Sequence, residues 1–185
     1  HLFSKYLFMR KIYFLFLAFY FFNVLNAQII NIPNANFKEK LLAADVNNDI
    51  VKKINGGAFK LDANNDGQIQ VSEALEVDEL NIAFSEISSL IGIEKFTNLV
   101  QMQCQGNKLI NVDLSNFLLL ENLHCNDNLL ESLNLGLNNL KDLDCSNNKL
   151  TSLNLSSLFN LNNLNCNNNN LSLLDVKGNN ELISL

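Results

Sequence analysis

Residues 140–155, LKDLDCSNNKLTSLNL, carry the pattern that decides the fold. Their skeleton is L-x-x-L-x-C-x-x-N-x-L-x-x-L-x-L, and it occurs four times from Leu99 onward, at steps of 21, 20 and 21 residues. Every copy places a cysteine five residues after its first leucine and an asparagine three residues after the cysteine. These positions are Leu99, Cys104 and Asn107; Leu120, Cys125 and Asn128; Leu140, Cys145 and Asn148; and Leu161, Cys166 and Asn169. Four such units at one spacing do not arise by chance.

This repeat predicts a solenoid. The segment L-x-x-L-x-C alternates as a short strand, with leucine and cysteine turned inward. A period of about 21 residues, with leucines and an Asn/Cys position at fixed offsets, is typical of leucine-rich repeats. We therefore predict an α/β solenoid, a leucine-rich-repeat array whose stacked strands form one parallel concave sheet. The buried asparagine amide is expected to bind backbone groups of its own turn and of the next copy, which would give a ladder.

The four cysteines are predicted to be free and buried. Their even number, in a chain that we expect to be secreted, invites a disulfide interpretation. However, all four occupy one inward strand position, one repeat apart, so their side chains point the same way into the core. No histidine pattern in the sequence supports zinc. We therefore interpret them as small buried hydrophobic residues.

Residues 1–27 are predicted to be a secretory signal peptide that does not belong to the fold. Lys5, Arg10 and Lys11 precede an apolar run over residues 12–22, and LNA at 25–27 resembles a cleavage site. The alternative, a membrane anchor, would need about 20 apolar residues. Met9 is a better start than His1, which would place residues 1–8 upstream of the natural start. We expect no membrane span once this segment is removed.

Residues 28–76 are predicted to form an N-terminal cap, and residues 77–185 the repeats. Asn34 is a candidate N-cap, and residues 35–44 are expected to form a short amphipathic helix with Phe37, Leu41 and Leu42 on one face. Such a unit would cover the open end of the repeat core. Because the array stops inside a copy, we expect the chain to be a fragment of a longer protein.

The stretch DANNDGQIQVSE, residues 62–73, predicts a calcium loop. It matches the pattern D-x-[DN]-x-[DN]-G-x5-E, in which alternate side chains supply oxygen ligands to a hard cation. The predicted ligands are Asp62, Asn64, Asp66, Gln68 and Glu73. An Asp-Gly turn in a polar linker is the alternative, but it explains neither Ile69, the apolar anchor of such loops, nor Glu73. We expect Ca2+ to have a structural role here. Asp45, Asn47 and Asp49 form a second, degenerate copy of this loop.

Two stretches resemble known protein families. In an atypical first repeat, residues 77–92, Ile82 and Ser85 stand where later copies have cysteine and asparagine. The sequence ISSLIGIEKFTNL at 87–99 resembles the first repeat of internalin-type leucine-rich-repeat proteins. The stretch from IPNANF through DANNDGQIQ to the cysteine repeats is more similar to secreted leucine-rich-repeat proteins of Bacteroidetes. The first resemblance implies an EF-hand-like cap; the second implies type IX secretion, although no sorting domain is visible.

The outward residues of the concave strands form the predicted partner surface. This face is amide-rich, mildly acidic and without aromatic residues. The predicted binding residues are Gln101, Gln103, Gln105, Asn122, His124, Asn126, Lys141, Asp142, Asp144, Asn163 and Asn165. We expect a protein or glycan partner at the cell surface. The net charge of −6 and the lack of a basic patch argue against nucleic acid.

The sequence contains no recognisable catalytic set. There is no Ser/His/Asp or Cys/His arrangement, and His124 is expected to pair with Asp144 on the neighbouring strand, which is an ordinary surface contact. Phe117 and Phe159 are expected to lie in the core. We therefore predict a secreted or cell-surface binding or adhesion module and not an enzyme. Two alternatives stay open: a passive structural spacer or coat array, and a non-catalytic part of a larger secreted enzyme.

Overall fold

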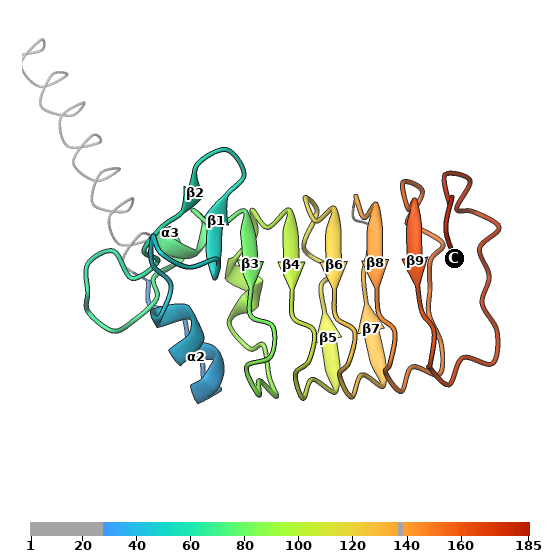
Figure 1. The fold of residues 1–185 in the computed structure, drawn as a ribbon, viewed down its shortest axis with the longest axis horizontal. Coiled ribbons are helices and arrows are strands. Elements are labelled where there is room, and N and C mark those ends of the chain that lie inside the picture. The colour runs from blue at the N-terminus through green and yellow to red at the C-terminus, as the bar shows by residue number, and fades with distance from the viewer. Residues whose placement is uncertain (1–27, 137–138) are drawn as a thin grey trace, which may run out of the picture.

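The computed structural model describes residues 28–136 and 139–185, which form a coil of stacked copies with a cap of helices and strands at the N-terminal end (Figure 1). The cap contains two short helices and a hairpin, and the copies contain short strands. The elements, in chain order, are α2 (Ala35–Leu42), β1 (Val51–Lys53), β2 (Gly57–Ala58), α3 (Val71–Ala74), β3 (Glu79–Asn81), the 3-10 helix η1 (Ile93–Lys95), β4 (Gln101–Gln103), β5 (Asn111–Asp113), β6 (Asn122–His124), β7 (Ser132–Asn134), β8 (Asp142–Asp144) and β9 (Asn163–Asn165).

The predicted parallel sheet is confirmed. Strands β3, β4, β6, β8 and β9 pair in parallel, one from each copy. Their central residues are buried and stand in one row across the sheet because every copy has the same register. The row consists of Leu80, Met102, Leu123, Leu143 and Leu164. The chain is therefore a leucine-rich-repeat solenoid with the period that the sequence indicates.

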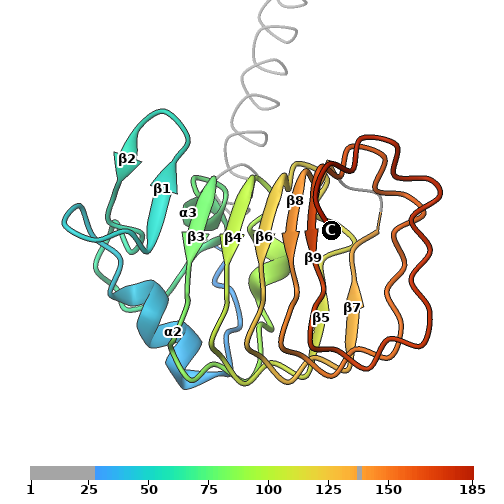
Figure 2. The ribbon, with the colours of Figure 1, turned by 45° about the vertical axis from the view of Figure 1, so that its right-hand side comes forward.

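The outer side of the coil is extended chain. Strands β5 and β7 pair in parallel and form a second, two-stranded sheet, which Figure 2 shows as a separate layer. Val112 and Leu114 from this layer are buried against the leucines of the concave sheet. Both α-helices of the described residues lie in the cap, so the array itself is a β-solenoid with one 3-10 turn, η1.

Asparagine side chains join the copies, but each one binds the preceding copy and not the next. Asn148 Nδ2 donates to the carbonyls of Cys125 in the preceding copy (3.1 Å) and Cys145 in its own (3.0 Å). Its Oδ1 accepts from Leu130 N at 2.9 Å. Asn107, Asn128 and Asn169 make equivalent bonds. The ladder thus satisfies backbone groups that every turn leaves inside the coil.

All four cysteines are free in the structure. Cys104, Cys125 and Cys145 are buried, whereas Cys166 is half-buried. Burial raises the pKa of the Cys104 and Cys145 thiols to about 12. Burial likewise raises the pKa of Cys125 well above its usual value. These thiols act as small core groups that stay protonated at neutral pH.

The cap combines a helix with a hairpin. Asn34 is the N-cap of α2, because its Oδ1 accepts from Phe37 N at 2.9 Å. Phe37 and Leu41 are fully buried, as their spacing predicts, while Leu42 is only partly buried. The helix ends at Leu42, two residues earlier than expected. Strand β1, which the sequence did not indicate, pairs antiparallel with β3 and extends the concave sheet into the cap.

One of the two core phenylalanines was predicted wrongly. Phe117 is buried, but Phe159 is 62% exposed. The reason is register: Phe117 follows Leu114 by three residues, and the equivalent position after Leu155 is Leu158, which is fully buried. Phe159 stands one residue past the inward slot and points outward. No helix among the described residues is long and apolar enough to cross a membrane, and the predicted signal peptide lies outside the described residues.

Candidate functional site: the concave face and the loop at residues 62–73

The concave sheet presents two rows of polar side chains. In each three-residue strand the central residue is buried, so the two flanking residues face outward. The register aligns one row of Glu79, Gln101, Asn122, Asp142 and Asn163 and a second row of Asn81, Gln103, His124, Asp144 and Asn165. The structure therefore brings eight of the eleven predicted binding residues onto one surface.

The other three predicted residues border the rows. Gln105 and Asn126 lie in the turns after β4 and β6, and both are half-buried. Lys141 precedes β8 and forms an ion pair with Glu121 of the previous copy at 2.8 Å. This pair leaves the surface without an unpaired cation at that point.

Side chains within the rows are bonded across the strands. Asn163 Nδ2 donates to Asp142 Oδ2 at 3.2 Å, and Asn165 Nδ2 donates to Asp144 Oδ2 at 3.1 Å. Each carboxylate is thus oriented by an amide from the following copy. Because the side chains are already held in place, a partner that binds them loses little additional conformational freedom.

His124 pairs with Asp142 and not with Asp144, which corrects the prediction. Its Nε2 lies 3.3 Å from Asp142 Oδ1. Asp144 is its direct neighbour in register, but both oxygens of Asp144 are already engaged. Oδ1 accepts from Ser146 N and Oγ at 3.0 and 2.7 Å, and Oδ2 accepts from Asn165. His124 is the only histidine among the described residues, and its side chain lies within hydrogen-bond distance of the Asp142 carboxylate.

An exposed aromatic side chain at the rim of this face was missed by sequence reasoning. The turn after each concave strand has a residue in the left-handed region, and these residues are Phe84, Gly106, Asp127, Asn147 and Asn168. Glycine, asparagine and aspartate adopt that conformation readily, whereas phenylalanine rarely does. Phe84 has φ 51° and is 74% exposed. Aligning Ile82 with the cysteine slot would have placed Phe84 in this column.

In the later copies this column of left-handed residues consists of Asp127, Asn147 and Asn168, whose side chains form a polar ladder along the rim. Asn147 Nδ2 donates to Asp127 Oδ1 at 2.9 Å, and Asn168 Nδ2 donates to Asn147 Oδ1 at 2.7 Å. The ladder runs parallel to the two rows of the concave face. A ligand that lies along the coil would meet an amide or carboxylate group in each of these copies.

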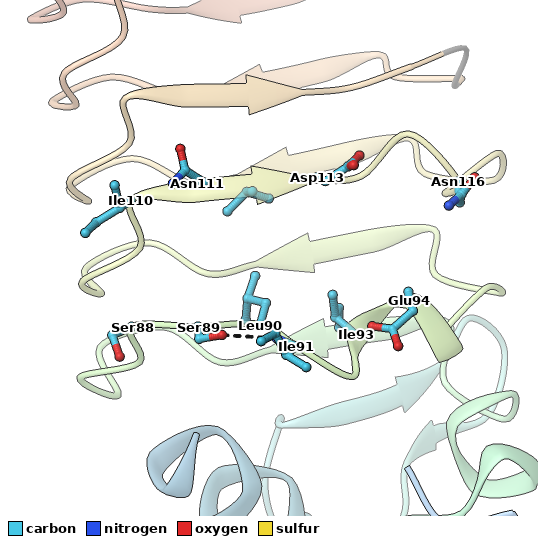
Figure 3. Close-up of a pocket in the computed structure, with 11 residues that line it drawn as sticks. Ser88, Ser89, Leu90, Ile91, Ile93, Glu94, Ile110, Asn111, Asp113 and Asn116 are labelled. Carbon is cyan, nitrogen blue, oxygen red and sulfur yellow. Dashed lines mark hydrogen bonds between the residues drawn. The ribbon is translucent and has the colours of Figure 1, made fainter. Parts of the chain in front are cut away.

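Two hollows adjoin the sheets. A small one of about 140 Å³ lies on the concave side, where cap residues Asp49 and Lys52 meet β3 and β4. A larger one of about 490 Å³ lies on the outer side between the first two copies. Figure 3 shows its lining, with Ser88, Ser89, Ile91 and Glu94 from one copy opposite Ile110, Asn111 and Asp113 from the next. Neither lining includes a histidine or a cysteine, and neither has a catalytic arrangement.

The loop at residues 62–73 is folded around its own carboxylates. Asp62 is buried, and its two oxygens accept from Asp66 N and Gly67 N, both at 3.1 Å. Glu73 lies in α3 and reaches back to the start of the loop, where it accepts from Ala63 N at 2.9 Å. Gly67 has φ 72°, and the side chain of Ile69 is buried. The loop is thus closed by hydrogen bonds from backbone N–H groups to its first and last carboxylates.

The predicted ligands are also linked to one another. Asn64 Nδ2 donates to Asp66 Oδ2 at 3.0 Å, and Gln68 Oε1 accepts from Lys38 Nζ of α2 at 2.8 Å. The backbone N–H of Gln68 donates a hydrogen bond to the Asp66 carboxylate, and this bond lowers the pKa of Asp66. Carboxylate and amide oxygens in one tight loop fit Ca2+ by donor type. Among the described residues, no three His, Cys, Asp or Glu side chains are grouped so as to hold a metal ion.

Comparisons with known proteins agree on the fold. No family model and no curated protein sequence matches the chain. The internalin InlF of Listeria monocytogenes has a similar structure, with a TM-score of 0.66 and 25% sequence identity over 83% of this chain. A leucine-rich-repeat protein of Leptospira interrogans has a TM-score of 0.56 and 21% identity over 62% of this chain. The chain spans 43% of the first structure and 32% of the second. Its structural neighbours are thus internalin and other leucine-rich-repeat proteins with a solenoid fold.

Proposed function

We propose that this chain belongs to a secreted or cell-surface protein, and that its repeats form a non-enzymatic binding or adhesion module. The observation that carries the proposal is the pair of polar rows on the concave sheet. These ten side chains face outward on a rigid parallel sheet, and carboxylates within the rows are oriented by amides of the next copy. The likeness to an internalin supports a protein partner, and a glycan is the other class of partner that we propose.

The test uses matched substitutions on the two faces of the coil. Gln103→Arg places a bulky cation in the second row of the concave face, and Asn111→Arg places the same side chain outward on β5 of the same copy. The fluorescently labelled chain would be applied to cultured epithelial cells and to bacterial cells, and binding measured by flow cytometry. We expect saturable binding that Gln103→Arg abolishes and Asn111→Arg leaves intact. Equal binding by all three proteins would refute a role for the concave face.

We also propose that Ca2+ binds the loop at residues 62–73 and has a structural role. Asp62, Asn64, Asp66 and Glu73 would supply side-chain oxygens, and Gln68 would contribute its carbonyl. Glu73 supports this, because its contact with Ala63 N joins the two ends of the loop. Extracellular modules bind Ca2+ with dissociation constants of roughly 10⁻⁴ to 10⁻³ M, a range suited to a secreted protein.

Export is the remaining part of the proposal, and it depends on residues 1–27. A signal peptide cleaved after Ala27 would give a mature chain that begins at Gln28. Edman sequencing of the protein recovered outside the producing cells should therefore read QIINIPNANF. Recovery of the uncleaved chain in the membrane fraction would instead indicate an anchor.

A further inference from the structure

The repeat pattern does not explain why a phenylalanine stands at position 84. It lies in a column where the other four copies have glycine, aspartate or asparagine, and its φ of 51° is unfavourable for a bulky side chain. Its side chain is 74% exposed, so it contributes little to the core. A strained residue with a large exposed apolar side chain is a reason to look for function.

The ring of Phe84 is held against Gly106 of the next copy. A Cβ atom at Gly106 would lie 2.2 Å from Phe84 Cδ1 and 2.4 Å from Cε1, so the ring occupies the space that a side chain at 106 would fill. Phe84 N donates to Gln105 O at 2.9 Å, which ties the backbone of the two turns together. The ring therefore rests on backbone and is fixed in orientation, while most of it remains open to solvent.

Hydrogen-bonding groups border this ring. The rim ladder of Asp127, Asn147 and Asn168 continues from Gly106 into the following copies, and the two polar rows run beside it. Gln105, whose carbonyl binds Phe84, also has a buried side-chain oxygen, Oε1, without a hydrogen-bond partner. An unpaired buried acceptor is unfavourable unless another donor satisfies it.

We propose that Phe84 and the adjoining polar rows bind a neutral polysaccharide. This inference depends on the binding function proposed above and names its ligand class. A sugar ring has an apolar C–H face, which can stack on an exposed aromatic ring, and hydroxyl groups that both donate to and accept from amides and carboxylates. A neutral chain along the coil would place successive sugars over successive copies.

The composition of the face argues against the other classes of partner. Residues 28–185 contain no Trp, Tyr or Arg, which are the side chains that dominate protein–protein hot spots. The outward residues of the five strands are amides, carboxylates and one histidine, with no aliphatic side chain among them. The acidic character of this face also disfavours nucleic acids and anionic glycans.

The experiment measures binding of the whole chain to cellohexaose, xylohexaose, laminarihexaose and chitohexaose by isothermal titration calorimetry. The matched variants are Phe84→Ala, which keeps the unfavourable φ but removes the ring, and Phe159→Ala, which removes the other exposed phenylalanine. We expect at least one hexaose to bind saturably. Phe84→Ala should weaken that binding about ten-fold, as expected for loss of one stacking contact, while Phe159→Ala should leave it unchanged.

The outcomes separate this inference from the proposed function. If no hexaose binds the unaltered chain at millimolar concentration, the glycan proposal is wrong. If the cell-binding assay is then positive, sensitive to Gln103→Arg and abolished by protease treatment of the cells, the partner is a protein and the binding function stands. If a hexaose binds equally well to the Phe84→Ala variant, Phe84 has no part in recognition. Far-UV circular dichroism of each variant shows whether the fold is preserved.

Discussion

The cap and the array satisfy their buried backbone groups by different chemistry. In the loop at residues 62–73, the carboxylate oxygens of Asp62 and Glu73 accept hydrogen bonds from backbone N–H groups. In the array, neutral amides such as that of Asn148 both donate and accept between copies. We therefore expect the loop to respond to pH and to Ca2+, and the amide ladder to respond to neither.

The largest effect is expected from removing an amide of the ladder. Asn148→Ala would leave the Cys125 carbonyl and Leu130 N without their side-chain partner in a buried turn. We expect a loss of about 3 kcal/mol in the free energy of unfolding, because buried unpaired groups cost about 1–3 kcal/mol each. Urea denaturation followed by circular dichroism measures it. The exposed Asn170→Ala is the control, because Asn170 lies outside the left-handed column, and it should change stability by less than about 0.5 kcal/mol.

The second effect is stabilisation by calcium, confined to the cap. At a concentration about ten times its dissociation constant, Ca2+ would stabilise the folded chain by about 1.4 kcal/mol. Thermal unfolding in EDTA and in millimolar Ca2+ measures this as a rise in Tm. The rise should disappear in Asp62→Ala and Glu73→Ala and persist in Asn168→Ala. If Ca2+ does not raise the Tm of the original chain, the proposed calcium site at residues 62–73 is wrong.

The third effect concerns the strained turn where the array begins. Phe84→Asn places a residue that tolerates the left-handed region in the same column as Asn147 and Asn168. The gain should be about 0.5–1 kcal/mol, since relief of the unfavourable φ outweighs the loss of an exposed ring. Chemical denaturation would detect it. A destabilised variant would mean that the ring on Gly106 matters to the fold, which would weaken the functional interpretation of Phe84.

The smallest effect is a pH dependence from Asp66. Hydrogen bonds hold its pKa in the folded state below the ordinary 3.8. The group therefore stabilises the fold at pH values above 3.8, and this contribution is lost as the pH falls through the lowered pKa. We expect Asp66→Asn to be less stable than the original chain at pH 6 and the difference to shrink as the pH falls below 3.8. The effect of Asn148→Ala should not vary over that range, because amides do not titrate.

Much of the array could be predicted from sequence because its rules are local and repeated. The inward leucines, the buried cysteines and the turn asparagines occupy fixed offsets, and the copies that begin at Leu99, Leu120 and Leu140 confirm their burial. In the fourth copy, Cys166 and Asn169 are only half-buried. The prediction failed for Phe159, where the inward slot was already filled by Leu158. A shift of one residue reverses the direction of a side chain in an extended segment, and composition alone cannot resolve it.

The cap and the candidate site were harder to predict from the sequence. The helix with Phe37 and Leu41 followed from its spacing, but strand β1 owes its existence to the free edge of β3, which lies 26 residues later in the chain. The partner of His124 depended on the hydrogen bonds that had already engaged Asp144. The roles of the predicted ligands in the calcium loop and on the concave face remain predictions.

The sequence by itself determined the solenoid, its period and the side chains that face outward, because these follow from a repeated alternation of apolar and polar residues. Only the tertiary structure decided how the copies interact: which copy each asparagine binds, which carboxylate His124 contacts, and that the ring of Phe84 rests on Gly106. Such contacts depend on the stacking of segments about one repeat apart. Their geometry depends on the sheet register and on competition between neighbouring groups for hydrogen-bond partners. The sequence of a single copy predicts neither.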